Sequence, residues 1–234
     1  LGDVYKRQPL IQWTDDKNSW WEYGSDIPGR NDSISSVKTK RSIQTPPLAL
    51  VHKYRFIADS IYANELRLFK QSQSKHSSSD EYWVENTMKK GTLKDRIAAM
   101  SVTLSTDPIH KFYALDGLLG MVGCSNSHGS GVGKTNSRVA QLTAEALEDL
   151  FTNTLLPPTR KLLSLAQRPL FQYDDKDGIN QDWDESERKK KNKIKSSSNG
   201  QKTLSPRILL LWRFEEMIKA VSYTHLRAHE TKCY

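Results

Sequence analysis

Apolar residues between positions 46 and 220 recur every three to five residues, and this spacing limits how the chain can fold more than any other feature does. Such a period places the apolar side chains on one face of an α-helix, whereas a strand would show strict alternation, and no segment does. Prolines, glycines and short polar stretches separate the periodic segments. We therefore predict an all-α fold in which antiparallel helices form a bundle or a helical-repeat stack.

The first two helices are predicted from Pro47 to the serine-rich stretch after Gln71, and from about 80 to 90. Gly91 is expected to end the second helix in a left-handed conformation, which glycine adopts without steric cost. The apolar residues of the first helix are Leu50, Tyr54, Ile57, Ile61, Leu66 and Phe69, and those of the second are Tyr82, Trp83 and Met88.

Thr92 and Asp95 resemble a capping box at the start of a third helix over 93–104, because each side chain can satisfy an amide of the first turn. Ala98 and Ala99 should allow a neighbouring element to approach this helix closely. The residues expected to be buried are Leu93, Ile97, Met100 and Leu104.

A fourth helix is predicted from Asp107-Pro108, since aspartate caps helices and proline is tolerated in the first turn. A fifth helix follows residue 137 and ends at Pro157, a short sixth ends before Pro169, and the last opens at Ser205-Pro206. The apolar residues of these four helices are, in order, Ile109, Phe112, Leu115, Leu119 and Val122; Val139, Leu142, Leu147, Leu150 and Phe151; Leu162, Leu163 and Leu165; and Ile208, Leu209, Leu211, Trp212 and Phe214.

The chain is expected to divide into six segments. Its two ends resemble translated sequencing-adapter read-through, so we expect the sequence to be a fragment of a longer protein with artificial tails. The segments are the adapter-like ends 1–8 and 221–234, an irregular and disordered aromatic/basic segment 9–45, a helical domain 46–171, a charged disordered linker 172–204, and a further helix 205–220.

The net charge of +8 and the pI of about 9.3 favour RNA or an acidic partner, although a solvated basic surface would give the same balance. The two cysteines lie in a Ser/Gly loop and beside the C-terminus, so a disulfide framework is not expected and a reducing compartment is. Apolar runs stay well short of the roughly 20 residues that a membrane span needs. We therefore expect no membrane partner.

Four aromatic residues near the N-terminus precede a polar stretch that contains Lys38, Lys40 and Arg41. Aromatic rings beside basic residues can stack on single-stranded RNA. Docking of the tryptophans on the helical body is the favoured interpretation. The four aromatic residues are Trp13, Trp20, Trp21 and Tyr23.

The loop 129–135 ends in Gly133-Lys134-Thr135 and resembles a phosphate-binding P-loop, which needs the pattern G-x-x-x-x-G-K-[ST]. The first glycine of that pattern should stand at His128, and Gly129 comes one residue too late. A P-loop also follows a buried strand, whereas the preceding residues have helical spacing. We interpret the loop as a flexible connection, with a nucleotide-binding protein as the alternative function.

Other catalytic or metal-binding patterns are missing from the sequence. The histidines at 52, 76, 110 and 128 show no spacing suited to zinc, and no cysteine pair accompanies them. His110 is expected in the first turn of the fourth helix, as a surface or helix-packing residue rather than a catalytic base. We predict no enzyme activity, no cofactor, no metal and no small-molecule substrate.

The segment Gly91-Thr92-Leu93-Lys94-Asp95-Arg96-Ile97-Ala98-Ala99-Met100 resembles the G-T-L-x-D-R-x-A-A-M stretch of the CCAAT-binding-factor family of nucleolar ribosome-assembly proteins. Arg213 stands where this family would have an aromatic residue. Further similar segments follow in the family's order: Asp107-Pro108-Ile109-His110, Leu155-Leu156-Pro157 with Arg160-Lys161-Leu162, Gln167-Arg168-Pro169-Leu170, and the run from Leu209 to Glu215.

The resemblance implies an armadillo/HEAT-like helical-repeat solenoid in the nucleus and nucleolus. It implies binding to a second nucleolar-complex protein and to the large-subunit pre-ribosome with its pre-rRNA, as a scaffold for assembly and transport. A CCAAT-binding transcriptional regulator and a scaffold that binds only protein are alternatives. A basic run could contact RNA phosphates or act as a nuclear-import signal, which we favour slightly over a solvated linker. It consists of Arg188, Lys189, Lys190, Lys191, Lys193 and Lys195.

Overall fold

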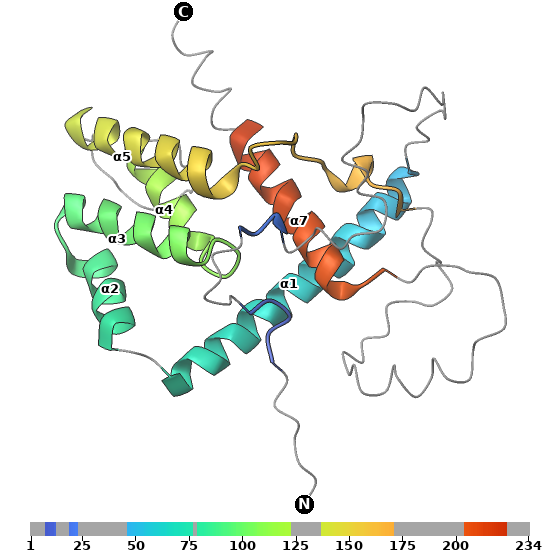
Figure 1. The fold of residues 1–234 in the computed structure, drawn as a ribbon, viewed down its shortest axis with the longest axis horizontal. Helices are drawn as coiled ribbons and strands as arrows, with labels where there is room; N and C mark the ends of the chain where they lie inside the picture. The colour runs from blue at the N-terminus through green and yellow to red at the C-terminus, as the bar shows by residue number, and fades with distance from the viewer. Residues whose placement is uncertain are drawn as a thin grey trace, which may run out of the picture.

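The computed structural model describes residues 8–12, 19–22, 46–76, 79–122, 137–170 and 204–223. These residues form helices and connecting turns, which confirms the all-α prediction (Figure 1). The α-helices are α1 (Leu48–His76), α2 (Ser79–Lys90), α3 (Leu93–Thr106), α4 (Tyr113–Val122), α5 (Ser137–Leu150) and α7 (Pro206–Val221), with a π-helical turn η2 (Phe151–Leu155) and a 3-10 turn η3 (Leu165–Gln167).

The helices pack in two groups (Figure 1). In the first, α3 contacts α2, α4 and α5, and α4 also packs on α5; in the second, α1 packs on α7, and both contact η3. Helix α7 is buried on most of its circumference, as expected of a helix whose apolar residues surround its axis. Its buried apolar residues are Leu209, Leu210, Leu211, Trp212, Phe214 and Ile218.

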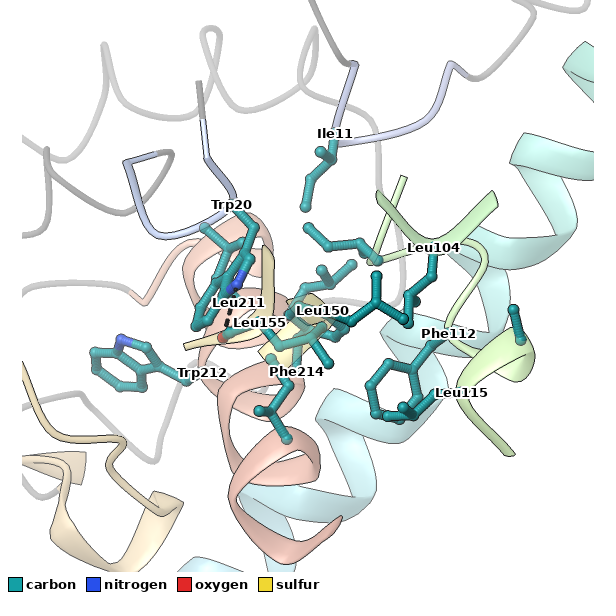
Figure 2. Close-up of a cluster of buried hydrophobic side chains, with 14 of the residues drawn as sticks. Ile11, Trp20, Leu104, Phe112, Leu115, Leu150, Leu155, Leu211, Trp212 and Phe214 are labelled. Atoms are coloured by element: carbon teal, nitrogen blue, oxygen red, sulfur yellow. Dashed lines mark hydrogen bonds between the residues drawn. The ribbon is translucent and has the colours of Figure 1, made fainter. Parts of the chain in front are cut away.

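A shared hydrophobic core joins the two groups (Figure 2). Phe214 of α7 is fully buried, and its ring meets Phe112, which precedes α4, edge to face with the centroids 5.4 Å apart. Leu104 of α3, Leu115 of α4 and Leu150 of α5 are also almost completely buried. Fully burying a leucine or phenylalanine side chain contributes about 1.5–3 kcal/mol, so this core supplies most of the free energy that holds the groups together.

The segment near the N-terminus covers this core. Trp20 is 2% exposed, and its indole Nε1 donates a hydrogen bond to the carbonyl of Leu155 at 3.2 Å (Figure 2). The Trp20 ring also meets Phe214 and Trp21 edge to face, at 5.3 and 5.7 Å. Docking on the helical body is thus confirmed for Trp20, whose buried ring cannot stack on RNA. Trp13, Tyr23 and the basic stretch at 38–41 lie outside the described residues.

The fourth helix begins at Tyr113, and the prediction that it starts at Asp107-Pro108 is wrong. Asp107 is the C-cap of α3, where its backbone N–H donates to Thr103. Its carboxylate accepts the backbone N–H of His110 at 3.0 Å, which holds the chain in a turn before α4. Aspartate that binds nearby amides favours turns over helix interiors.

The predicted sixth helix is also wrong, because only the short turn η3 forms there. The backbone N–H groups of Leu163 and Leu165 donate to the carboxylates of Glu215 and Glu216, at 2.7 and 3.3 Å. These amides therefore bind side chains of α7 instead of carbonyls of their own segment. The last helix, in contrast, opens at Ser205-Pro206 as predicted.

The buried faces of the first three helices differ from the prediction. Helix α1 continues beyond Gln71 to His76. Leu93 is 47% exposed and Ala98 lies at the surface, whereas Ala99 and Thr103 face the core. Tyr82 and Trp83 are exposed too. The buried stripe of α1 is Val51, Tyr54, Ala58, Ile61, Glu65 and Leu68, while Leu50, Ile57, Leu66 and Phe69 are half-buried.

Gly91 does not adopt the left-handed conformation that the sequence predicted. Its N–H still ends α2 by donating to the Thr87 carbonyl at 2.8 Å. A Cβ atom on Gly91 would lie 2.5 Å from that carbonyl oxygen. Glycine is therefore required here because the Thr87 carbonyl oxygen occupies the place of a Cβ atom, and not because the backbone has a positive φ.

Candidate functional site: buried carboxylate networks

Glu215 of α7 is the centre of a network that holds the segment between η2 and η3. Its carboxylate accepts hydrogen bonds from Arg160 at 2.5 and 3.0 Å, from Arg168 at 2.6 Å, and from the Leu163 backbone N–H at 2.7 Å. The Glu215 side chain is 2% exposed. A buried carboxylate needs such charge-assisted partners, because burial without them costs several kcal/mol.

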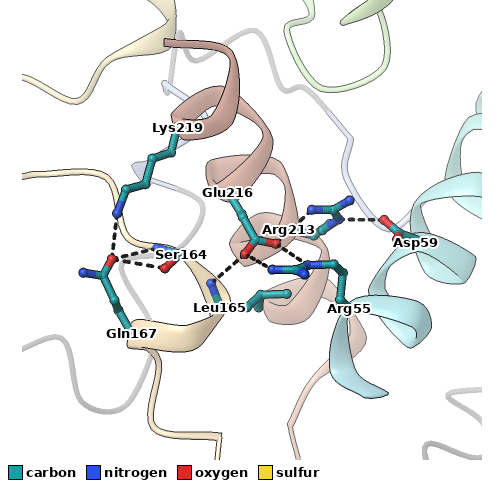
Figure 3. Close-up of polar contacts among 8 residues, drawn as sticks. All are labelled: Arg55, Asp59, Ser164, Leu165, Gln167, Arg213, Glu216 and Lys219. Carbon is teal, nitrogen blue, oxygen red and sulfur yellow. Dashed lines mark hydrogen bonds and ion pairs between the residues drawn. The ribbon is translucent and has the colours of Figure 1, made fainter. Parts of the chain in front are cut away.

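Glu216, the next residue, ties α7 to α1 (Figure 3). Arg55 of α1 binds both carboxylate oxygens at 2.8 and 3.2 Å, Arg213 binds at 2.8 Å, and the Leu165 N–H also donates to it. Burial alone would raise the pKa of Glu216, but the hydrogen bonds and the positive charges of Arg55 and Arg213 hold it below its usual value. Glu216 is therefore ionised at neutral pH.

Arg213, which departs from the resembled pattern, has a structural role of its own. Its guanidinium also donates to Asp59 of α1 at 2.6 Å (Figure 3). One arginine thus bridges a carboxylate on each of the two packed helices. An aromatic residue at this position could not make either ion pair.

A second network joins α1 to the turn between α3 and α4. The fully buried imidazole of His110 contacts Asp107 through Nδ1 at 2.7 Å and Glu65 of α1 through Nε2 at 3.2 Å. The imidazole stacks on Phe69, with the centroids 4.0 Å apart. Tyr62 of α1 adds a hydrogen bond from its hydroxyl to the Ile109 carbonyl at 2.7 Å.

The Glu65 carboxylate also binds the segment near the N-terminus. It accepts the backbone N–H groups of Leu10 and Ile11 at 2.8 and 2.9 Å. Ile11 is 1% exposed. Glu65 thus connects three parts of the chain that are far apart in sequence.

Burial lowers the pKa of His110, but its hydrogen bonds with Asp107 and Glu65 and their negative charges outweigh burial and raise it to about 9. His110 is therefore an imidazolium between two carboxylates at neutral pH. Its side chain is fully buried, so a substrate cannot reach the imidazole to exchange a proton with it. The His–carboxylate arrangement therefore stabilises the fold. The interpretation of His110 as a helix-packing residue is confirmed. The prediction that it lies in the first turn of α4 is wrong, because His110 precedes that helix.

The motif 91–100 acts locally, as capping and packing. Thr92 is the N-cap of α3 and its hydroxyl accepts the Asp95 N–H at 3.4 Å. The Asp95 carboxylate accepts the Thr92 hydroxyl at 2.6 Å instead of an amide, so only half of a capping box forms. Arg96 donates from Nε to the Met88 carbonyl at 3.0 Å, which caps the end of α2.

We predict that Gly91→Ala destabilises the protein by about 1–3 kcal/mol, because the new methyl group meets the Thr87 backbone at 2.5 Å. Gly117→Ala is the matched control. A Cβ there meets the flexible end of Met100 at 2.9 Å, and alanine favours the helix by roughly 0.5–1 kcal/mol, so stability should stay nearly unchanged. Urea unfolding midpoints compare the two variants; equal midpoints would contradict the backbone clash.

The remaining predicted positions lie outside the described residues. These are the loop 129–135 with Lys134, and the basic run from Arg188 to Lys195. Within the described parts of the chain, no group of three or more metal-ligating side chains is arranged to hold an ion. No helix among these residues has the length and apolar character to cross a membrane.

The sequence patterns assigned no buried ion pair to Glu65, Glu215 or Glu216. A hint was available, because each lies at a helical position otherwise occupied by buried apolar residues, as Glu65 does between Ile61 and Leu68. A charged residue within an apolar stripe indicates a buried partner. The identity of that partner depends on tertiary contacts 45 to 161 residues away in sequence.

Comparison with known proteins supports the resemblance seen in the sequence. No family model matches the chain. It is 25% identical to human CCAAT/enhancer-binding protein zeta over 190 residues, which is 81% of this chain and 15% of the human protein. It is 28% identical to nucleolar complex protein 1 of Drosophila melanogaster over 203 residues, which is 87% of this chain and 14% of that protein.

A third relative is the ribosome biogenesis protein NOC1 of Chaetomium thermophilum, 23% identical over 186 residues. That match covers 79% of this chain and 16% of the fungal protein. The chain therefore spans about one seventh of the length of these relatives.

Proposed function

Because this chain is related to CCAAT/enhancer-binding protein zeta and to the nucleolar complex proteins, we propose that it is part of a non-catalytic scaffold of nucleolar ribosome biogenesis. Two of these relatives are named for the nucleolus or for ribosome biogenesis, so the protein acts in the nucleolus and nucleus. The name of the human relative denotes a binding protein, and that of the Drosophila relative denotes a protein of a complex.

The resemblance suggests a more specific role for the protein within the nucleolus. The protein assembles and transports the large-subunit pre-ribosome and binds a second nucleolar-complex protein. The helices 46–171 and 205–220 form the beginning of an armadillo/HEAT-like solenoid, in which each element covers the apolar face of its neighbour. The basic run 188–195 contacts rRNA phosphates or directs nuclear import.

One observation supports a scaffold in particular. The buried charged side chains of the described residues, among them Glu65, His110, Glu215 and Glu216, all bind other parts of the same chain. Their burial leaves them no contact with a reacting group. An interior devoted to holding helices together suits a protein that presents surfaces to partners.

Gradient sedimentation tests the proposal. A tagged form of the protein should co-sediment with large-subunit precursors from cell extract and should leave those fractions after ribonuclease treatment. A second tagged nucleolar protein of unrelated fold serves as the control for nonspecific trapping. Sedimentation as free protein under all conditions would show that the similarity concerns the fold alone.

The names of the human and mouse relatives favour one other candidate, binding to CCAAT-containing DNA. A mobility-shift assay with a CCAAT duplex and a scrambled duplex distinguishes the two. Equal binding of both duplexes removes this candidate. The nucleotide-binding alternative at 129–135 stays a prediction, and unchanged nucleotide affinity in Lys134→Ala would exclude it.

A further inference from the structure

A groove of about 440 Å³ lies between the segment that follows η2 and the C-terminal part of α7. Leu156, Pro157, Leu162 and Leu163 contribute apolar lining. Arg160, Lys161 and Lys219 contribute positive charge. The groove is open to solvent, and its lining residues Lys161, Leu156, Pro157 and Leu162 take no part in the carboxylate networks.

We propose that this groove binds a short acidic segment of a partner protein, with apolar side chains on the groove's leucines and carboxylates at its basic rim. The inference deepens the proposed scaffold function and rests on it.

Charge complementarity is the main argument for an acidic ligand. Arg160 is paired with the buried carboxylate of Glu215, so the charge available to a ligand comes from the two lysines of the groove. Lys219 donates to the neutral amide oxygen of Gln167 at 2.7 Å, and its charge is not neutralised by that contact (Figure 3). Lys161 is exposed at the rim. The groove therefore presents the positive charges of Lys161 and Lys219 in addition to Arg160, which is paired with Glu215.

Two cations of the groove, Arg160 and Lys219, are held in place before any ligand binds. Glu215 fixes Arg160 through two hydrogen bonds. Gln167 fixes Lys219 and is itself held by the backbone N–H and hydroxyl of Ser164, at 3.0 and 3.3 Å (Figure 3). Side chains already ordered in the free protein lose little conformational entropy on binding, which favours affinity.

The backbone that forms the groove is unusual. Helix α5 passes into the π-helical turn η2, closed by a hydrogen bond from the Leu156 N–H to the Phe151 carbonyl at 2.9 Å. This wide turn presents Leu156 and Pro157 to the groove while the Leu155 carbonyl binds Trp20.

A protein ligand fits the groove better than RNA does. Single-stranded RNA is bound by aromatic side chains that stack on bases, together with cations for the phosphates. The described residues that line this groove are aliphatic, polar or cationic, with no aromatic ring among them. Aliphatic lining with a basic rim suits leucine-like and acidic side chains of a peptide.

Fluorescence anisotropy with the full chain tests the proposal. The probe is a labelled 12-residue peptide of glutamates with leucines three residues apart, and the comparison probes are the same peptide with lysines for glutamates and a 12-nucleotide single-stranded RNA. The acidic peptide should bind saturably and weaken as salt is raised. The double variant Lys161→Glu/Lys219→Glu should weaken it by about tenfold, since two ion pairs are reversed.

The matched control is Lys90→Glu/Lys94→Glu, which makes the same change of charge at exposed lysines of α2 and α3. This variant should bind the acidic peptide as the unchanged protein does. Equal weakening in both double variants, or no saturable binding of the acidic peptide at low salt, overturns the proposal. Loss of RNA binding in the groove variant with peptide binding retained overturns it in favour of RNA. The anisotropy assay contains no pre-ribosome. A negative result would therefore count against the groove as a peptide site and not against the proposed scaffold function, which sedimentation tests.

Discussion

Glu215→Gln should destabilise the protein by about 3–5 kcal/mol, because it removes one partner of a buried ion-pair network. The amide keeps the size of the side chain but cannot accept from two guanidinium groups and the Leu163 N–H with the strength of a carboxylate. The partly buried guanidinium of Arg160 would then lose the carboxylate that pairs with it. The segment between η2 and η3 should detach from α7 first, since Glu215 is its main polar contact.

Urea unfolding of Glu215→Gln, followed by circular dichroism, gives the loss of stability. Glu148→Gln is the matched control, because Glu148 is exposed on α5 and its change should alter stability by less than about 0.5 kcal/mol. Limited proteolysis in the native state should cut near residues 158–163 faster in the Glu215 variant. Equal stability of the two variants would show that the network contributes little.

His110→Leu should cost about 3 kcal/mol at pH 6.5 or below, since it leaves Asp107 and Glu65 buried together without the imidazolium that separates their charges. The raised pKa of His110, about 9 in the folded protein against about 6.5 unfolded, sets the pH dependence. A raised pKa means that the stabilisation is fully present below pH 6.5. It is lost as pH rises towards 9, by roughly 3 kcal/mol in all.

Unfolding midpoints measured at pH 6, 7.5 and 9 should therefore fall for the unchanged protein and stay nearly level for His110→Leu. His52→Leu, at an exposed position of α1, should follow the unchanged protein at each pH. If the unchanged protein and His110→Leu show the same pH dependence, the imidazolium is not the titrating group. Because Glu65 also binds the N–H groups of Leu10 and Ile11, loss of this network should free the segment near the N-terminus as well.

The His110–Glu65 network lies where the two groups of helices meet, whereas the Glu216 contacts with Arg55 and Leu165 lie within the second group. Glu215 and Glu216 connect α7 to the segment that follows α5 and to α1, while His110 and Glu65 connect α1 to the turn before α4. The hydrophobic core alone would favour burial without fixing which helix faces which. Buried ion pairs with defined geometry favour one arrangement over others, and we expect this specificity to be their main contribution.

Residue patterns along the chain were enough to predict that it is helical, where most helices lie, and which family it resembles. Apolar spacing and local caps act within a few residues, so α2, α3, α5 and α7 could be predicted closely, including the Thr92 N-cap and the Ser205-Pro206 start. The same local pattern predicted helices at Asp107 and at Leu162, and there it was wrong. At both positions a carboxylate binds backbone N–H groups that a helix would use.

Which polar residues are buried, and what they bind, depends on contacts between segments far apart in the sequence. Glu65 and His110 are 45 residues apart, and Arg55 and Glu216 are 161 apart, so no local pattern could pair them. The tertiary structure also decided that Gly91 serves a close backbone contact and that Trp20 closes the core. The physical reason is that helix formation depends on neighbours along the chain, whereas the burial of a charge is stable only where the fold brings its partner within hydrogen-bonding distance.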